Sequence, residues 1–226
     1  MKTWFVTGTD TEIGKTFAAC DLVRHLVSSG QRVAVAKPIA SGGEHTRDGL
    51  RNEDALALMA ASNVRASYDL VNPYCFAPPI APHLAASAVG VEIELQRAAR
   101  ITREVEADWL VVEGAGGWSI PLDEQRMLCD LARAFTTQVL LVVGLRLGCI
   151  NHALLSARQI RRDGFELVGW VANHVDPDML AQEGNLETLD RLIDAPRICT
   201  LPFAGQPPDM VHGDWLIPCG PSSVKC

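Results

Sequence analysis

The stretch of this sequence best suited to chemistry is a glycine-containing loop that ends in Gly14-Lys15-Thr16. It reads Thr7-Gly-Thr-Asp-Thr-Glu-Ile-Gly-Lys-Thr16, follows the apolar run Trp4-Phe5-Val6 and precedes an apolar-periodic stretch that begins at Phe17. This strand–loop–helix layout is typical of a phosphate-binding loop, because backbone N–H groups of the loop and of the helix start converge on one anion. Lys15 would reach the β- and γ-phosphates of a nucleotide, and the Thr16 hydroxyl would take one site on Mg²⁺.

The spacing of this loop departs from the usual pattern. Five residues separate Gly8 from Gly14, where the common motif has four, so Thr9 stands at the position of the first glycine. The sequence therefore predicts a long variant of the loop, which indicates a subfamily.

Two carboxylates are candidates for holding the metal. Glu113 follows the apolar run Trp109-Leu-Val-Val112, and a carboxylate at the tip of a buried strand beside a phosphate loop can bind Mg²⁺. A solvent-facing strand end is the alternative for Glu113. Asp54 could be a second carboxylate on the metal, and it equally suits the acidic preference of a first helical turn.

A lone cation, Lys37, ends the apolar run Val33-Ala-Val-Ala36. It lies beside the phosphate loop if the first two strands are neighbours, and it could then stabilise charge on a transferring phosphoryl group or an anionic substrate. A surface lysine in a loop is the alternative. Thr11 and Ser41 are candidate hydrogen-bond donors to substrate or simple turn residues, and the Asn173 amide could read a base edge.

Composition limits the class of protein. The chain has 226 residues, 48% hydrophobic and 21% charged, which suits one α/β domain, expected over residues 1–217 with a mobile tail at 218–226. A net charge of −7 argues against a nucleic-acid partner. No apolar stretch is long enough for a bilayer and no signal-peptide pattern is present, so we expect no membrane partner and a cytoplasmic location. None of the seven cysteines forms a Cys-x-x-Cys pair, and His83, His152 and His174 lack metal-like spacing.

Alternating apolar runs and helical patterns predict an α/β fold, a phosphate-loop domain whose mostly parallel β-sheet has helices on both faces. Strands are expected at 3–7, 33–37, 108–112, 139–143, 167–172 and 197–201. Helices are expected at 15–29, 53–61, 92–106, 124–135, 151–163 and 184–193. The stretch at 72–83, with four prolines, is expected to be irregular.

Seven segments, in order, resemble the dethiobiotin synthetase family. They are the loop at 7–16, Lys37-Pro-Ile-Ala-Ser41-Gly, Arg51-Asn-Glu-Asp54-Ala, Val71-Asn-Pro-Tyr74, Val112-Glu-Gly-Ala-Gly-Gly-Trp118, Leu147-Gly-Cys-Ile-Asn-His152 and Gly169-Trp-Val-Ala-Asn173. The long loop spacing is part of the resemblance, which covers about residues 3–175.

The resemblance implies an ATP-dependent carboxylation in biotin synthesis. One amine of 7,8-diaminopelargonate takes up CO₂ as a carbamate, and the γ-phosphoryl group of MgATP passes to the carbamate oxygen. The second amine then attacks this carbamic–phosphoric anhydride, which closes the ureido ring and releases phosphate. Such a reaction needs positioning and charge neutralisation rather than a protein nucleophile.

The resemblance also implies a role for each matching residue. Lys37 would be the catalytic lysine, and Thr16, Asp54 and Glu113 would serve Mg²⁺. ATP would contact Glu12, Ile13, Gly14, Lys15, Thr16, Phe17, Asp54, Glu113, Gly114, Ala115, Gly116, Asn173, His174, Leu201, Pro202 and Phe203. Substrate would contact Thr11, Lys37, Ser41 and Gly117, and in the family's homodimer its carboxylate tail would meet Gly148, Cys149 and Asn151 of the neighbouring copy, at the start of a helix.

Some features differ from the family, and two other classes stay open. The family often has Asp where this chain has His174, and the match is poor after about residue 176. One alternative is a nucleotide-switched dimeric ATPase of the partitioning type, although the lysine that such proteins carry early in the loop is absent from Gly8-Thr-Asp-Thr11. The other is an amidoligase of cobalamin synthesis, whose glutamine-hydrolysing domain would not fit in 226 residues.

Overall fold

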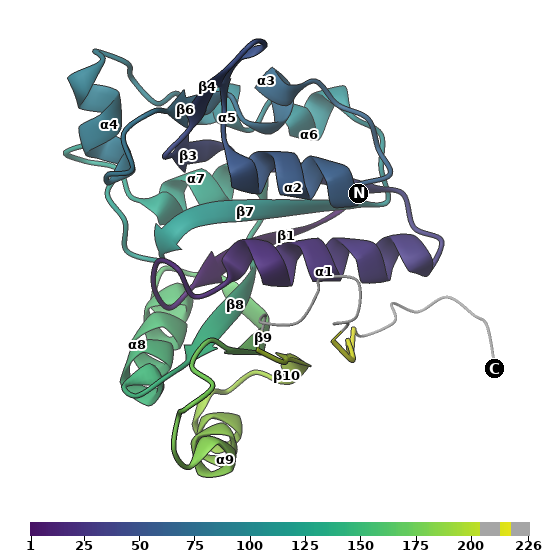
Figure 1. Cartoon of the computed structure of the whole chain (residues 1–226), viewed down its shortest axis with the longest axis vertical. Coiled ribbons are helices and arrows are strands. Elements are labelled where there is room, and N and C mark those ends of the chain that lie inside the picture. Colours follow the sequence, from purple (N-terminus) through teal and green to yellow (C-terminus); the bar gives the residue numbers. More distant parts are fainter. Residues whose placement is uncertain (204–212, 218–226) are drawn as a thin grey trace.

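A central sheet of six parallel strands dominates the computed structural model, which describes residues 1–203 and 213–217. Its strands are β1 (Lys2–Gly8), β2 (Val33–Ala36), β7 (Trp109–Gly117), β8 (Gln138–Leu145), β9 (Glu166–His174) and β10 (Arg197–Leu201). Across the sheet they follow the order β10-β9-β8-β1-β7-β2 (Figure 1). The prediction of a mostly parallel α/β fold is confirmed, whereas the predicted tail at 218–226 lies outside the described residues.

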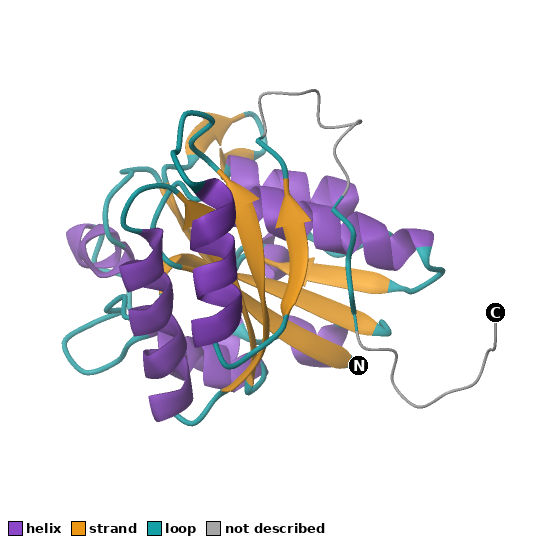
Figure 2. Cartoon of the chain, turned by 90° about the horizontal axis from the view of Figure 1, so that it is seen from below, coloured by secondary structure: helices purple, strands orange, loops and turns teal. Residues whose placement is uncertain are grey.

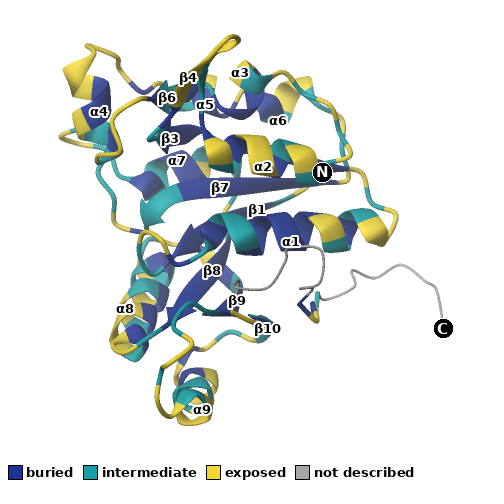
Figure 3. Ribbon diagram, in the orientation of Figure 1, coloured by how far each residue is buried: buried dark blue, intermediate teal, exposed yellow. Residues whose placement is uncertain are grey.

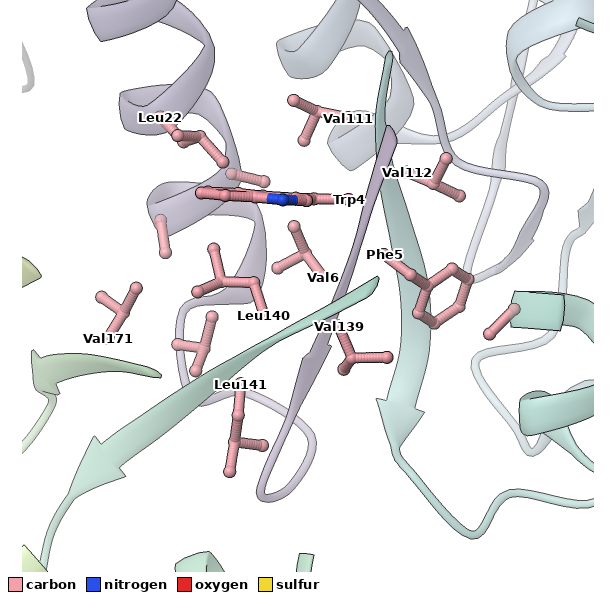
Figure 4. Packing of buried hydrophobic residues seen from close by; sticks show 14 of the residues in the cluster. Trp4, Phe5, Val6, Leu22, Val111, Val112, Val139, Leu140, Leu141 and Val171 are labelled. Atoms are coloured by element: carbon pink, nitrogen blue, oxygen red, sulfur yellow. The ribbon is translucent and has the colours of Figure 1, made fainter. Parts of the chain in front are cut away.

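The strands are buried because helices pack on both faces of the sheet (Figure 2). Trp4 and Phe5 project to opposite sides of β1, and Trp4 lies toward Leu22 of helix α1 (Lys15–Ser28) (Figure 4). The Phe5 ring instead meets the Trp118 ring edge-on, with centroids 6.4 Å apart. Successive side chains of a strand alternate between faces, so a strand covered on both faces reads as a continuous apolar run. Figure 3 shows the strands as the buried centre of the fold.

The other helices are α2 (Glu53–Ala61), α3 (Tyr68–Val71), α4 (Pro82–Ala88), α5 (Leu95–Ala98), α6 (Ile101–Glu104), α7 (Leu128–Phe135), α8 (Cys149–Arg162) and α9 (Gln182–Leu192). Five of the six predicted helices are present, and α2 has the predicted bounds. No helix within the described residues is long and apolar enough to cross a membrane.

Two helix predictions need correction. The single helix expected at 92–106 is wrong: the chain forms the short helices α5 and α6, separated where the Arg100 N–H bonds to the Arg97 carbonyl in a tight turn. The helix expected to begin at 124 begins at Leu128 instead. The Asp123 carboxylate accepts hydrogen bonds from the backbone N–H groups of Gln125 and Arg126, and this local turn competes with helix.

Short strands were not predicted in two regions. β3 (Ile39–Ser41) pairs in parallel with β6 (Tyr74–Phe76), inside the stretch expected to be irregular. β4 (Glu44–Thr46) and β5 (Gly49–Arg51) form an antiparallel hairpin. Strands of three residues are too short for periodicity to reveal, and their pairing is long-range or depends on a turn.

Residues 213–217 return from the end of β10 to the helix that follows the phosphate loop. The buried Asp21 carboxylate of α1 accepts hydrogen bonds from the Gly213 N–H, at 3.0 Å, and from the Trp215 indole N–H, at 2.7 Å. The Leu216 N–H bonds to the Ile198 carbonyl on β10 at 2.8 Å. This segment therefore ties the edge strand to α1.

Candidate functional site

The loop between β1 and α1 packs tightly against the end of β9. Gly14 has a φ of 77° and stands immediately before α1. A Cβ at this position would lie 2.2 Å from Nδ2 of Asn173, so both the conformation and the space require glycine. Glu12 also has a positive φ, 57°, which is unfavourable for a residue with a side chain. Strained backbone of this kind gathers at ligand-binding loops.

The Lys15 side chain turns back over this loop. Its Nζ donates to the Asp10 carbonyl at 2.6 Å, and the residue is only 7% exposed. Burial, and next the nearby Lys37 ammonium, lower the pKa of Lys15 to about 8. A buried ammonium is costly without an anionic partner, so this position favours a bound anion such as phosphate.

Lys37 is buried and lies between two carboxylates. Its Nζ is 2.5 Å from Oε1 of Glu113 and 3.1 Å from Oδ2 of Asp54. Lys37 and Glu113 are 4% and 0% exposed, so the alternatives of a surface lysine and a solvent-facing strand end are both wrong. Asp54 lies in the first turn of α2, as one of its two interpretations has it, and its role on a metal stays a prediction.

The strand order corrects the reason given for this proximity. β1 and β2 are not neighbours, because β7 lies between them. Lys37 follows β2 and reaches Glu113 on β7, a residue 76 positions away along the chain. The lysine meets the phosphate-loop region through this shared carboxylate.

Charge pairing outweighs burial at this cluster. Burial lowers the pKa of Lys37, but Glu113 and Asp54 raise it more, so its pKa lies above the ordinary value. Burial raises the pKa of Asp54, but Lys37, the Thr16 hydroxyl and Lys15 together lower it more, so that this pKa lies below the ordinary value. Lys37 therefore stays an ammonium, and Asp54 a carboxylate, at neutral pH.

The oxygen atoms of this cluster suit a hard divalent cation. The Thr16 hydroxyl donates to Oε1 of Glu113 at 2.9 Å. Oε2 of Glu113 is buried with no hydrogen-bond partner among the described residues. An unpaired buried carboxylate oxygen is costly in a folded protein, and together with the Thr16 hydroxyl and the Asp54 carboxylate it provides the kind of ligands that Mg²⁺ prefers.

A cavity of about 720 Å³ opens beside these residues. Eleven of the predicted site residues line it: Thr11, Glu12, Gly14, Lys15, Thr16, Lys37, Ser41, Asp54, Glu113, Ala115 and Gly116. Oγ of Ser41 is buried without a hydrogen-bond partner in the described part of the chain. The structure thus brings the two lysines, the carboxylates and three hydroxyl-bearing residues (Thr11, Thr16 and Ser41) to one cavity.

Sequence reasoning missed part of the cavity wall. Ala40, Pro79, Ile80, Ala81, Pro82 and Ile120 also line it. The cluster of prolines at 73–82 was the available signal, because a chain that cannot continue a helix or strand is often shaped for a site.

Asn173 lies at the end of β9 with its amide orientation fixed. Nδ2 donates to the Ile13 carbonyl at 2.8 Å, while Oδ1 is buried without a partner among the described residues. Neighbouring His174 is half-buried, and burial lowers its pKa. The Ile13 carbonyl can only accept a hydrogen bond, so the NH₂ group of the Asn173 amide must face it. The amide oxygen of Asn173 therefore points away from Ile13. A base-reading role for Asn173 and His174, and contacts from Leu201, Pro202 and Phe203, remain predictions.

Four predicted substrate residues do not line this cavity. Gly117, at the end of β7, lines a smaller neighbouring hollow together with Thr11, and the other three lie at the start of α8. Gly148, with a φ of 96°, precedes α8, and Cys149 and Asn151 lie in its first turn. None of the three lines the large cavity of their own chain. Burial raises the pKa of Cys149, which disfavours the reactive thiolate form of this side chain.

Fold and site together define a phosphate-loop nucleotide-binding protein. Residues 2–206 match a family model described as an AAA domain. The MinC:MinD cell division protein complex of Aquifex aeolicus contains a chain of the same fold, with a TM-score of 0.58 at 14% identity over 91% of this chain and 82% of that one. A likeness at this identity concerns the fold alone.

Sequence comparison is more specific. The ATP-dependent dethiobiotin synthetase BioD of Pseudomonas aeruginosa (strain LESB58) is 53% identical over 205 residues, 89% of this chain and 90% of that protein. The protein of the same name from Pseudomonas paraeruginosa is 51% identical over 226 residues, 97% of this chain and 99% of its own length. The chain belongs to the ATP-dependent dethiobiotin synthetase family.

Proposed function

We propose that this chain catalyses the ATP-dependent carboxylation of 7,8-diaminopelargonate with CO₂ and the closure of the ureido ring, giving dethiobiotin, ADP and phosphate. The family supports this activity through relatives at 53% identity. The observation that carries it is the convergence of Lys15, Lys37 and Ser41 on one cavity beside a phosphate-binding loop. A partitioning-type ATPase is not favoured, because the likeness to MinD is at 14% identity.

Each step assigns work to residues of the site. One amine of the substrate adds to CO₂ and loses a proton to solvent, and the resulting carbamate is an anion that the Lys37 ammonium and the Ser41 hydroxyl would hold in the cavity. The γ-phosphoryl group of ATP passes to a carbamate oxygen, with ADP leaving, while Lys15 stabilises the negative charge on the phosphates. The second amine attacks the carbonyl carbon, the bond to phosphate breaks, and the amine proton is lost as the ring closes.

Thr16, Asp54 and Glu113 would hold Mg²⁺ in this proposal. The metal would neutralise charge on the phosphates of ATP. Lys37 now contacts both carboxylates, so its ammonium would have to give up part of that contact to reach a carbamate. The flexible four-carbon stem of lysine permits this movement within the cavity.

A second copy of the chain would complete the substrate site. Gly148, Cys149 and Asn151 lie outside the cavity of their own chain, yet the first turn of α8 presents backbone N–H groups that suit a carboxylate. Leu147, beside this turn, is 94% exposed, and a large exposed apolar side chain next to a binding turn suits a protein interface. We propose a homodimer in the cytoplasm in which each copy holds the carboxylate tail of its neighbour's substrate.

The test is product formation from purified protein. MgATP and bicarbonate are supplied with and without 7,8-diaminopelargonate, while released phosphate is measured and the organic product is weighed by mass spectrometry. We expect phosphate release that depends on the diamine and a product that has gained one ring carbonyl and lost two hydrogens relative to the diamine. Phosphate release at the same rate with and without the diamine would instead indicate a switch-type ATPase.

A further inference from the structure

An ion pair joins the phosphate loop to the end of β8. The Arg146 guanidinium contacts Oδ2 of Asp10. Neither residue lines the cavity that contains Lys15 and Lys37. The pair is nevertheless one contact away from Lys15, because the Asp10 carbonyl accepts the hydrogen bond from Nζ of Lys15 at 2.6 Å.

Asp10 is held on both sides of its carboxylate. Oδ1 accepts a hydrogen bond from the Thr11 N–H at 2.8 Å, and Oδ2 receives Arg146. Two contacts on one short side chain restrict the peptide unit that follows it, and this unit carries the carbonyl that Lys15 meets. The Asp10 side chain thus influences where the Lys15 ammonium lies.

The backbone of Arg146 belongs to a hydrogen-bonded turn. Its carbonyl accepts a hydrogen bond from the Cys149 N–H at 3.0 Å, and Gly148 provides the left-handed conformation, φ 96°, from which α8 begins. Because β8 is a central strand of the sheet, its end provides a rigid base for the guanidinium.

Exposure separates a positioning role from a stabilising one. The side chains of Arg146 and Asp10 are 42% and 44% exposed, and ion pairs this exposed to water contribute little to folding stability. If this ion pair contributed only to folding stability, its loss would change the free energy of unfolding very little.

We propose that Arg146 is a positioning residue for ATP binding, which acts through Asp10 to keep the Lys15 ammonium in place for the phosphates. This inference rests on the proposed ATP-dependent function of the same site. The size of a half-exposed ion pair predicts that its loss weakens ATP binding about two- to fivefold.

The experiment measures the dissociation constant of MgATP by calorimetry at low salt, using the full chain. The variants are Arg146→Ala, Arg146→Lys, Asp10→Asn and the double variant Asp10→Asn with Arg146→Ala. The matched control is Asp190→Asn, because Asp190 pairs with Arg197 at similar exposures of 38% and 31% away from the cavity. Urea unfolding of each variant reports whether it is folded.

We expect Arg146→Ala to weaken ATP binding two- to fivefold, Arg146→Lys to restore most of it, and the double variant to be no worse than either single change. Asp190→Asn should bind ATP like the wild type, and the Arg146→Ala defect should fade at high salt. The proposal is overturned if Arg146→Ala binds ATP normally, if the single losses add, or if Asp190→Asn is equally impaired. Because the wild type is assayed separately for dethiobiotin formation, failure here is distinct from failure of the proposed function.

Discussion

At the scale of single residues, the site depends on two buried lysines with opposite surroundings. Lys37 lies against two carboxylates, which raise its pKa above the ordinary value despite its burial. Within residues 1–203 and 213–217, Lys15 donates to a backbone carbonyl and forms no ion pair, and burial lowers its pKa to about 8. One ammonium is therefore already neutralised by the protein, and the other is left for an incoming anion.

Replacing Lys37 by glutamine should reduce turnover by at least about 100-fold, because the carbamate and the transferring phosphoryl group lose a positive charge. MgATP binding should persist, since Lys15 still meets the phosphates. Steady-state assays measure turnover, and calorimetry measures binding. Near-normal turnover in this variant would refute the catalytic role of Lys37. Lys2→Gln, which removes a lysine charge from an exposed position at the start of β1, is the control and should keep normal turnover.

Binding of MgATP should take up protons near pH 8. With a pKa of about 8, Lys15 is only partly protonated there in the free protein, and phosphate anions favour its charged form. Below about pH 6 Lys15 is already fully protonated, so uptake at this residue vanishes. The measurement is calorimetry in buffers of different ionisation enthalpy. Lys15→Arg should lose this uptake, because arginine stays protonated; an undiminished uptake would assign it to another group.

At the scale of elements, the phosphate loop packs against the end of β9, and this packing depends on the conformation and the small size of one glycine. Gly14 combines a φ of 77° with a contact that leaves no room for a Cβ beside Asn173. Gly164, after α8, has a similar φ of 81°, but no described residue has an atom within 4 Å of the place of its Cβ. A substitution at Gly164 therefore measures the cost of a positive φ alone, whereas a substitution at Gly14 adds the cost of a steric clash with Asn173.

Gly14→Ala should therefore abolish tight ATP binding, whereas Gly164→Ala should lose about 1 kcal/mol of unfolding free energy and bind ATP normally. Calorimetry gives the ATP affinity, and urea unfolding gives the stability of both variants. Equal ATP affinity in the two proteins would show that the contact with Asn173 does not shape the loop.

At the scale of the whole molecule, the start of α8 lies apart from the cavity of its own chain, so the proposed homodimer can be disrupted there without changing that cavity. Leu147→Glu places a charge on a side chain that is 94% exposed, and we expect it to produce a monomer by analytical ultracentrifugation. The monomer should bind MgATP but lose most affinity for the diamine. Leu56→Glu on α2, where Leu56 is 45% exposed, is the control and should stay dimeric. A monomeric Leu147→Glu protein with full activity would rule out the shared site.

Much of the molecule could be predicted from local patterns. The continuous apolar runs indicated all six strands of the main sheet, since strands buried on both faces lack polar alternation. Asp123 shows why a boundary was missed, because its side chain bonds to the backbone of its own turn and delays α7. The pair β3–β6 was missed because each strand has only three residues and their pairing is long-range.

By itself the sequence determined the phosphate loop, the family and the candidate residues, because these depend on residue types at fixed local spacing. Tertiary structure decided which of them meet. β7 lies between β1 and β2, and this order brings Lys37 to Glu113 although 76 positions separate them. The same fold sets Gly148, Cys149 and Asn151 apart from the cavity. Contacts between residues distant along the chain follow from strand order and packing, and these cannot be predicted from the local spacing of residues.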